Sequence, residues 1–82
     1  MSFIHNIQLI RRIHYSILHK STGPPKQFAE RLNISERTLY RILDEIKGHG
    51  AIITYDYKRS SYVYQNEREI KGLLRFNSTD DN

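Results

Sequence analysis

Apolar side chains recur every three or four positions near the start of the chain, at Phe3, Ile7, Ile10, Ile13, Ile17 and Leu18. This spacing gathers them on one face of a helix. Ser2 can cap the first turn through its hydroxyl. The pattern predicts an amphipathic helix that ends at about Leu18 or His19 and packs its apolar face on another element.

Two shorter apolar groups follow, with turn residues before each. Gly23, Pro24 and Pro25 suit the end of one helix and the first turn of the next. Phe28, Ala29 and Leu32 then share one face of a short helix that ends at Asn33. Asn tolerates a left-handed backbone, so a tight turn is expected at this position.

A third helix is predicted from the capping residue Ser35 to Gly48. Its buried face is formed by Leu39, Ile42, Leu43 and Ile46, at spacings of three and four. The opposite face carries Arg37, Tyr40, Arg41 and Asp44.

Beyond Gly50 the apolar period changes to two. Ile53, Tyr55 and Tyr57 form one extended run, and Tyr62, Val63 and Tyr64 form another. The polar residues 58–61 between them predict a hairpin with a basic tip. In residues 70–76, Ile70, Gly72, Leu74 and Phe76 alternate as in a strand, whereas Ile70, Leu73 and Leu74 also suit a helix. We favour an extended segment there.

The predicted fold class is therefore α+β: three helices, a two-stranded β-hairpin and a short C-terminal segment. Residues 1–76 are expected to form a single domain, and the polar residues 77–82 a disordered tail.

The segment PPKQFAERLNISERTLYRILDEIKGHGA carries a resemblance to the winged helix-turn-helix family. Ala29 stands where the family places a small residue at the helix crossing, and Asn33 replaces the usual Gly of the turn. The string SERTLYRILDEIKGHGAII with the hairpin resembles the N-terminal module of deoxyribose-operon-repressor-like and biotin-repressor-like transcription regulators. In those families a sensing or catalytic domain usually follows, and no such domain is expected here.

Composition narrows the function classes. A chain of 82 residues buries only about 60% of its unfolded surface, which disfavours an enclosed cleft and hence an enzyme. It has no Cys, so disulfides, thiolate nucleophiles and Cys-containing zinc sites are excluded. No apolar run is long enough for a membrane span, and no secretory signal is recognisable. We expect a cytoplasmic protein without cofactor, metal, membrane contact or an evident small-molecule effector.

The net charge is +4, from 13 basic and 9 acidic residues. Asp80 and Asp81 belong to the tail, and residues 1–76 alone carry 13 basic and 7 acidic residues, or +6. A basic surface favours polyanions but is also simply a solvated one.

The resemblance and the charge together point to double-stranded DNA, with the helix 35–48 in the major groove and the wing 55–64 on the backbone. Arg37 is expected to contact base edges and Arg41 bases or phosphates, while Ser35 and Thr38 lie near a helix start that favours a phosphate. Glu36 can accept a hydrogen bond from cytosine. The predicted DNA-binding residues are Lys26, Ser35, Glu36, Arg37, Thr38, Tyr40, Arg41, Lys58 and Arg59.

Other interpretations of these residues stay open. Arg37 and Arg41 can pair with Asp44 or Glu45 on a solvated face. The hairpin tyrosines can stack on bases, although we expect them to cover the core with their hydroxyls in water. No two His residues have the spacing of a metal-ligand pair on a helix, and His14 falls on the apolar face of the first helix.

A small transcription regulator is the leading functional prediction. The alternatives are a recombination accessory protein of the excisionase kind, a winged-helix module that binds proteins, and an RNA-binding protein. Homodimerisation is a separate question, and its candidate surfaces are the first helix and residues 69–76.

Overall fold

A computed structural model describes residues 3–68 of the chain. Three helices come first: α1 (Phe3–Leu18), α2 (Pro25–Leu32) and α3 (Glu36–Gly48). Two antiparallel strands follow, β1 (Ile53–Asp56) and β2 (Ser61–Tyr64). This order confirms the α+β class and is consistent with a winged-helix-like topology. The predicted extended segment 70–76, the domain boundary at 76 and the Ser2 cap lie outside the described residues.

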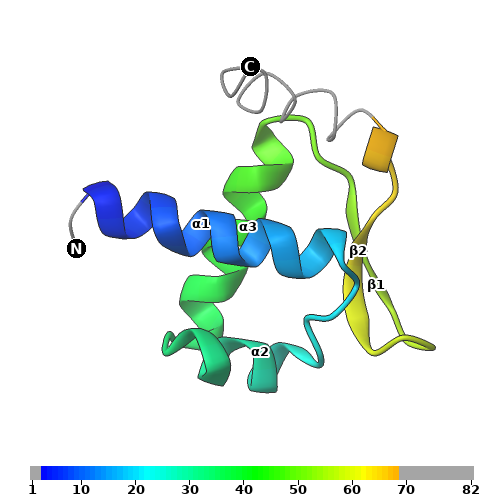
Figure 1. The fold of residues 1–82 in the computed structure, drawn as a ribbon, viewed down its shortest axis with the longest axis horizontal. Coiled ribbons are helices and arrows are strands. Elements are labelled where there is room, and N and C mark those ends of the chain that lie inside the picture. The colour runs from blue at the N-terminus through cyan, green and yellow to red at the C-terminus, as the bar shows by residue number, and fades with distance from the viewer. Residues whose placement is uncertain (1–2, 69–82) are drawn as a thin grey trace, which may run out of the picture.

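The helices cross around a small core. α1 crosses in front of α3, α2 lies below them, and the hairpin stands at one side (Figure 1). Ile13, Ile17, Phe28 and Leu39 are completely buried where these elements meet. The buried positions of α2 and α3 are those predicted from the apolar spacing, with Ile46 half-buried at the edge. Within residues 3–68, no helix is long and apolar enough to cross a bilayer.

The turn between α2 and α3 has the predicted geometry. Pro25 stands at the start of α2, and Asn33 adopts φ 62° and ψ 41°, a left-handed conformation. Ser35 then caps α3, since its hydroxyl oxygen accepts a hydrogen bond from the backbone nitrogen of Thr38 at 3.0 Å. Asn33 therefore performs the conformational role that Gly has in the family pattern.

The hairpin turn lies one residue earlier than predicted. Tyr57, expected in the first strand, belongs to the turn, and Ser61, expected in the turn, begins β2. The cause is Asp56, whose carboxylate accepts hydrogen bonds from the backbone nitrogens of Lys58 (2.9 Å) and Arg59 (3.3 Å). An Asp side chain that bonds the backbone two residues ahead starts a turn at its own position.

Two buried hydroxyls join the linker after α1 to the hairpin. The backbone nitrogen of Thr22 donates to Ser61 Oγ at 3.0 Å, and the backbone nitrogen of Tyr62 donates to Thr22 Oγ1 at 2.9 Å. Both side chains are 1% exposed. These bonds satisfy backbone groups that have no partner within a helix or the sheet, and they fix the hairpin beside the helices.

A second buried contact holds the base of β2 against α1. His14 Nδ1 lies 2.7 Å from the hydroxyl of Tyr64, and His14 Nε2 is buried with no hydrogen-bond partner among residues 3–68. Burial lowers the pKa of His14 from 6.5 and raises that of Tyr64 to about 12. Both side chains are therefore neutral at pH 7, and the tyrosine hydroxyl does not remain in water as expected from the sequence.

Replacing Ser61 with Ala should lower the free energy of unfolding by about 1–3 kcal/mol, because the buried amide of Thr22 loses its acceptor. Chemical denaturation measures this change. Ser21→Ala is the matched control, since Ser21 is exposed in the same linker. An equal loss in both variants would contradict the role assigned to the buried hydroxyl.

Stability should also fall on acidification. Because the folded state holds the pKa of His14 below 6.5, only the unfolded state gains a proton just below that pH. The contribution of this group is complete above pH 6.5 and is lost as the pH falls towards the folded pKa. Denaturant titrations across this range should give a shallower pH dependence for His14→Leu/Tyr64→Phe, which removes both partners. An unchanged slope would show that other groups cause it.

Candidate nucleic-acid interface

The outer face of α3 presents two arginines. Leu39, Ile42 and Leu43 turn inwards, so Arg37 and Arg41 lie on the opposite, exposed side. The ion pairs among the described residues are Lys20 with Glu67 and Arg59 with Asp56. Neither arginine therefore pairs with Asp44 or Glu45, and within residues 3–68 no ion pair engages either guanidinium group.

The first turn of α3 is less open than the sequence suggested. Ser35 accepts the capping bond, and its hydroxyl also donates to Thr38 Oγ1 at 3.0 Å. Glu36 is exposed, and Tyr40 points its hydroxyl at the Glu36 carboxylate, 3.5 Å away. The two hydroxyls and the carboxylate predicted to contact DNA thus already have partners within the helix, although each keeps further hydrogen-bonding capacity.

The turn of the hairpin carries two basic residues, of which one is ion-paired with a described residue and the other is not. Lys58 is exposed and makes no ion pair with a described residue, whereas Arg59 Nε lies 3.2 Å from Asp56 Oδ2. Asp56 therefore closes the turn and also offsets the charge of Arg59. Lys58 is the cation at this tip with the least compensation.

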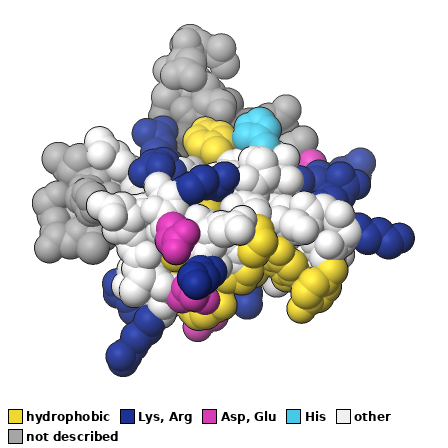
Figure 2. Space-filling view, turned by 90° about the horizontal axis from the view of Figure 1, so that it is seen from below, with side chains coloured by type: hydrophobic (Ala, Val, Ile, Leu, Met, Phe, Trp, Pro, Cys, Tyr) yellow, Lys and Arg dark blue, Asp and Glu magenta, His cyan; other side chains and the backbone are white. Residues whose placement is uncertain are grey.

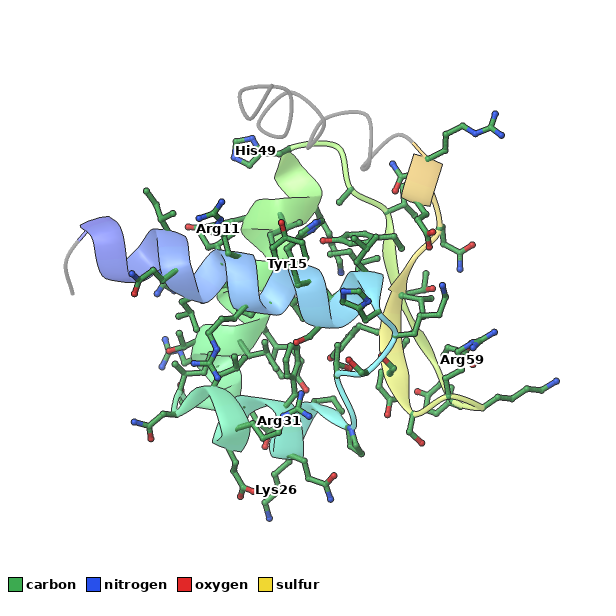
Figure 3. All side chains as sticks on the ribbon, in the orientation of Figure 1. Arg11, Tyr15, Lys26, Arg31, His49 and Arg59 are labelled. Carbon is green, nitrogen blue, oxygen red and sulfur yellow. The ribbon has the colours of Figure 1, made fainter. Side chains whose placement is uncertain are left out.

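The two basic residues of α2, Lys26 and Arg31, have different surroundings. Lys26 is exposed in the first turn and projects away from the core (Figure 3). Arg31 instead donates to the carbonyl oxygens of Ser21 (3.3 Å) and Thr22 (3.1 Å), and its guanidinium lies over the ring of Phe28. Arg31 thus stabilises the linker, while the exposed side chain of Lys26 can extend the candidate interface.

A row of tyrosines connects α3 to the tip of the hairpin, and we call Tyr40, Tyr62, Tyr55 and Tyr57 the tyrosine row. Tyr55 makes edge-to-face contacts with Tyr62 (5.1 Å between centroids) and Tyr57 (4.9 Å). Burial, then the adjacent Tyr40, raises the pKa of Tyr62 to about 12. Figure 2 shows exposed hydrophobic side chains extending towards the hairpin.

Only part of this row covers the core. Tyr62 is half-buried and packs against Phe28. Tyr57 is 84% exposed and Tyr40 45% exposed, so the expectation that the hairpin tyrosines cover the core is wrong for Tyr57. The one-residue shift of the turn explains this, because it removes Tyr57 from the strand and its pattern of alternating faces.

The histidines form no metal site in the part of the chain described, where no three His, Asp or Glu side chains are close enough to hold an ion. His14 instead belongs to the buried contact with Tyr64. The apolar position of His14 in α1 had indicated burial, but not its partner fifty residues away.

The sequence contained one unused signal for the shape of this surface. Asp56 at the start of the turn segment is a common turn former, and it would have placed Tyr57 at the tip. No local pattern indicates the bond between Thr22 and Ser61, because these residues are 39 positions apart.

Comparison of the chain with protein-family models, with curated proteins and with solved structures gives no match.

Proposed function

We propose that this chain is a winged helix-turn-helix domain that binds double-stranded DNA sequence-specifically and regulates transcription. The observation that carries the proposal is that Arg37 and Arg41 are exposed on the outer face of α3 and make no ion pair with any residue the structure describes. The order of elements and the basic hairpin support it.

α3 has the dimensions of a helix that enters a major groove, and its positive charge is concentrated in two arginines on the outer face rather than in the helix as a whole, which carries three basic and three acidic residues. The groove admits a helix, and arginine recognises guanine through two parallel hydrogen bonds. Arg37 and Arg41 are one helical turn apart and lie on one face, so both can contact the same stretch of major groove when α3 is docked in it. Glu36 and Tyr40 stand at the edge of this face, where Glu36 retains the capacity to accept from a cytosine amino group.

The remaining predicted residues extend the contact along the backbone. Lys58 and Arg59 reach sideways from the hairpin, and Lys26 lies at the start of α2. Contacts of this kind position a protein on DNA without reading sequence. They also make the affinity fall as salt rises, since bound phosphates release counterions.

The test is selection of bound duplexes from a random pool, followed by affinity measurements on the selected site. Arg37→Ala/Arg41→Ala should weaken binding to that site by at least about 1–3 kcal/mol, the usual value of one base-reading arginine. The control is Arg11→Ala/Arg68→Ala, which removes two exposed arginines outside α3 and the hairpin. It should retain most of the site preference.

No selected sequence, or equal losses in both double variants, would refute specific DNA binding through α3. Recovery of a stoichiometric protein partner together with sequence-blind duplex binding would instead indicate a protein-interaction module. Strong bending of the selected duplex would favour an accessory role in recombination over regulation.

Asp56→Asn should tighten DNA binding at low salt. The amide oxygen can keep the bonds to the turn, but the negative charge beside Arg59 is lost. The dependence of log affinity on log salt should steepen by about one unit if Arg59 gains a phosphate contact. Asp44→Asn, with the same charge change on α3, separates a local effect from net charge. An unchanged slope for Asp56→Asn would contradict a backbone contact by Arg59.

A further inference from the structure

The tyrosine row has an exposed end that the fold does not require. Tyr57 is 84% exposed, and the ring contact recorded for it among the described residues is the edge-to-face contact with Tyr55. Such a contact leaves most of the ring surface free. A large aromatic ring left in water gives up the stabilisation that burial would provide, so this position favours an external partner.

The tip that carries Tyr57 is held in a defined shape. Asp56 bonds two backbone nitrogens of the turn and pairs with Arg59. Ser60 completes the turn with a left-handed backbone at φ 50°. The ring is therefore presented on a constrained turn next to Lys58. Because the turn is already ordered, less conformational entropy is lost when a partner stacks on the ring.

The charges around the row indicate which part of a nucleic acid would meet it. Lys58 and Arg59 stand at the tip, whereas Glu36 contacts Tyr40 at the other end. A carboxylate beside the rings disfavours phosphates there but accepts hydrogen bonds from base amino groups. Tyrosine hydroxyls are uncharged at neutral pH, so the rings themselves add no charge to the row. The row is thus suited to bases, with the strand's phosphates towards the cations.

We propose that Tyr40, Tyr62, Tyr55 and Tyr57 form a stacking site for unpaired DNA bases, so that the domain binds best where a duplex opens into a single strand. This inference rests on the duplex binding proposed for α3. Stacking on tyrosine is tolerant of sequence because every base has an aromatic face. The duplex on α3 and the single strand on the row would then be neighbouring parts of one DNA molecule.

The experiment compares the selected duplex with blunt ends and the same duplex extended by a short thymine overhang on either strand. One overhang should tighten binding by about tenfold, as expected for stacked bases. A fluorescent base analogue in the overhang should report stacking directly. Tyr57→Leu, which keeps an apolar side chain but removes the aromatic face, should reduce the gain. Tyr57→Phe keeps the aromatic face and should therefore retain the gain in affinity from the overhang.

Tyr15→Leu is the matched control, because Tyr15 is a 47% exposed tyrosine on α1, outside the row. It should retain the preference for the overhang. If the overhang gives no gain while the blunt duplex binds, or if Tyr57→Leu and Tyr15→Leu behave alike, the stacking site is wrong and duplex binding stands. If no duplex binds at all, the proposed function fails and this inference fails with it.

Discussion

The position of the hairpin depends on two buried hydroxyl groups. Thr22 and Ser61 satisfy each other and the neighbouring backbone, so the linker after α1 acts as an additional edge beside β2. Leaving these backbone groups unpaired would cost more than their hydrogen bonds contribute in net terms, so the contact strongly selects one arrangement. Through it, the position of the basic turn is fixed by a contact between the linker after α1 and the first residue of β2.

Local patterns predicted the three helices and the buried faces of α2 and α3, but only part of the face of α1, where Ile7 is 40% exposed and Leu9 is buried instead. They were insufficient for the contacts between elements. The spacing of Leu39, Ile42 and Leu43 predicted the buried face of α3, and Asn33 with Ser35 predicted the turn before it. These features depend on neighbours in sequence. The partners of Thr22 and His14 are distant in the chain, and polar contacts of this kind leave no periodic signal. The turn was predicted one residue too late because the alternating tyrosines indicate a longer first strand, whereas the Asp56 carboxylate bonds the backbone and ends that strand at residue 56.

The candidate site likewise has one part that the sequence predicts and one part that only the structure shows. The exposure of Arg37 and Arg41 follows directly from the helical period, and the structure adds that no described carboxylate compensates them. A basic residue is not equally available wherever it occurs. Arg31 is engaged with the linker carbonyls and Arg59 with Asp56. The +4 charge of the whole chain therefore says less about binding than the few cations that have no ion-pair partner in the described part of the chain.

The register of the hairpin has a consequence for how its length can vary. Ile53 pairs with Tyr64 and Tyr55 with Tyr62, so these four side chains share one face, buried near the helices and more open towards the turn. Side chains alternate between faces at every residue. Inserting two residues in each strand would lengthen the hairpin and preserve this face, whereas inserting one in each would move every strand residue between the insertion and the turn onto the other face. Changes in hairpin length that keep the aromatic face continuous should therefore come in steps of two.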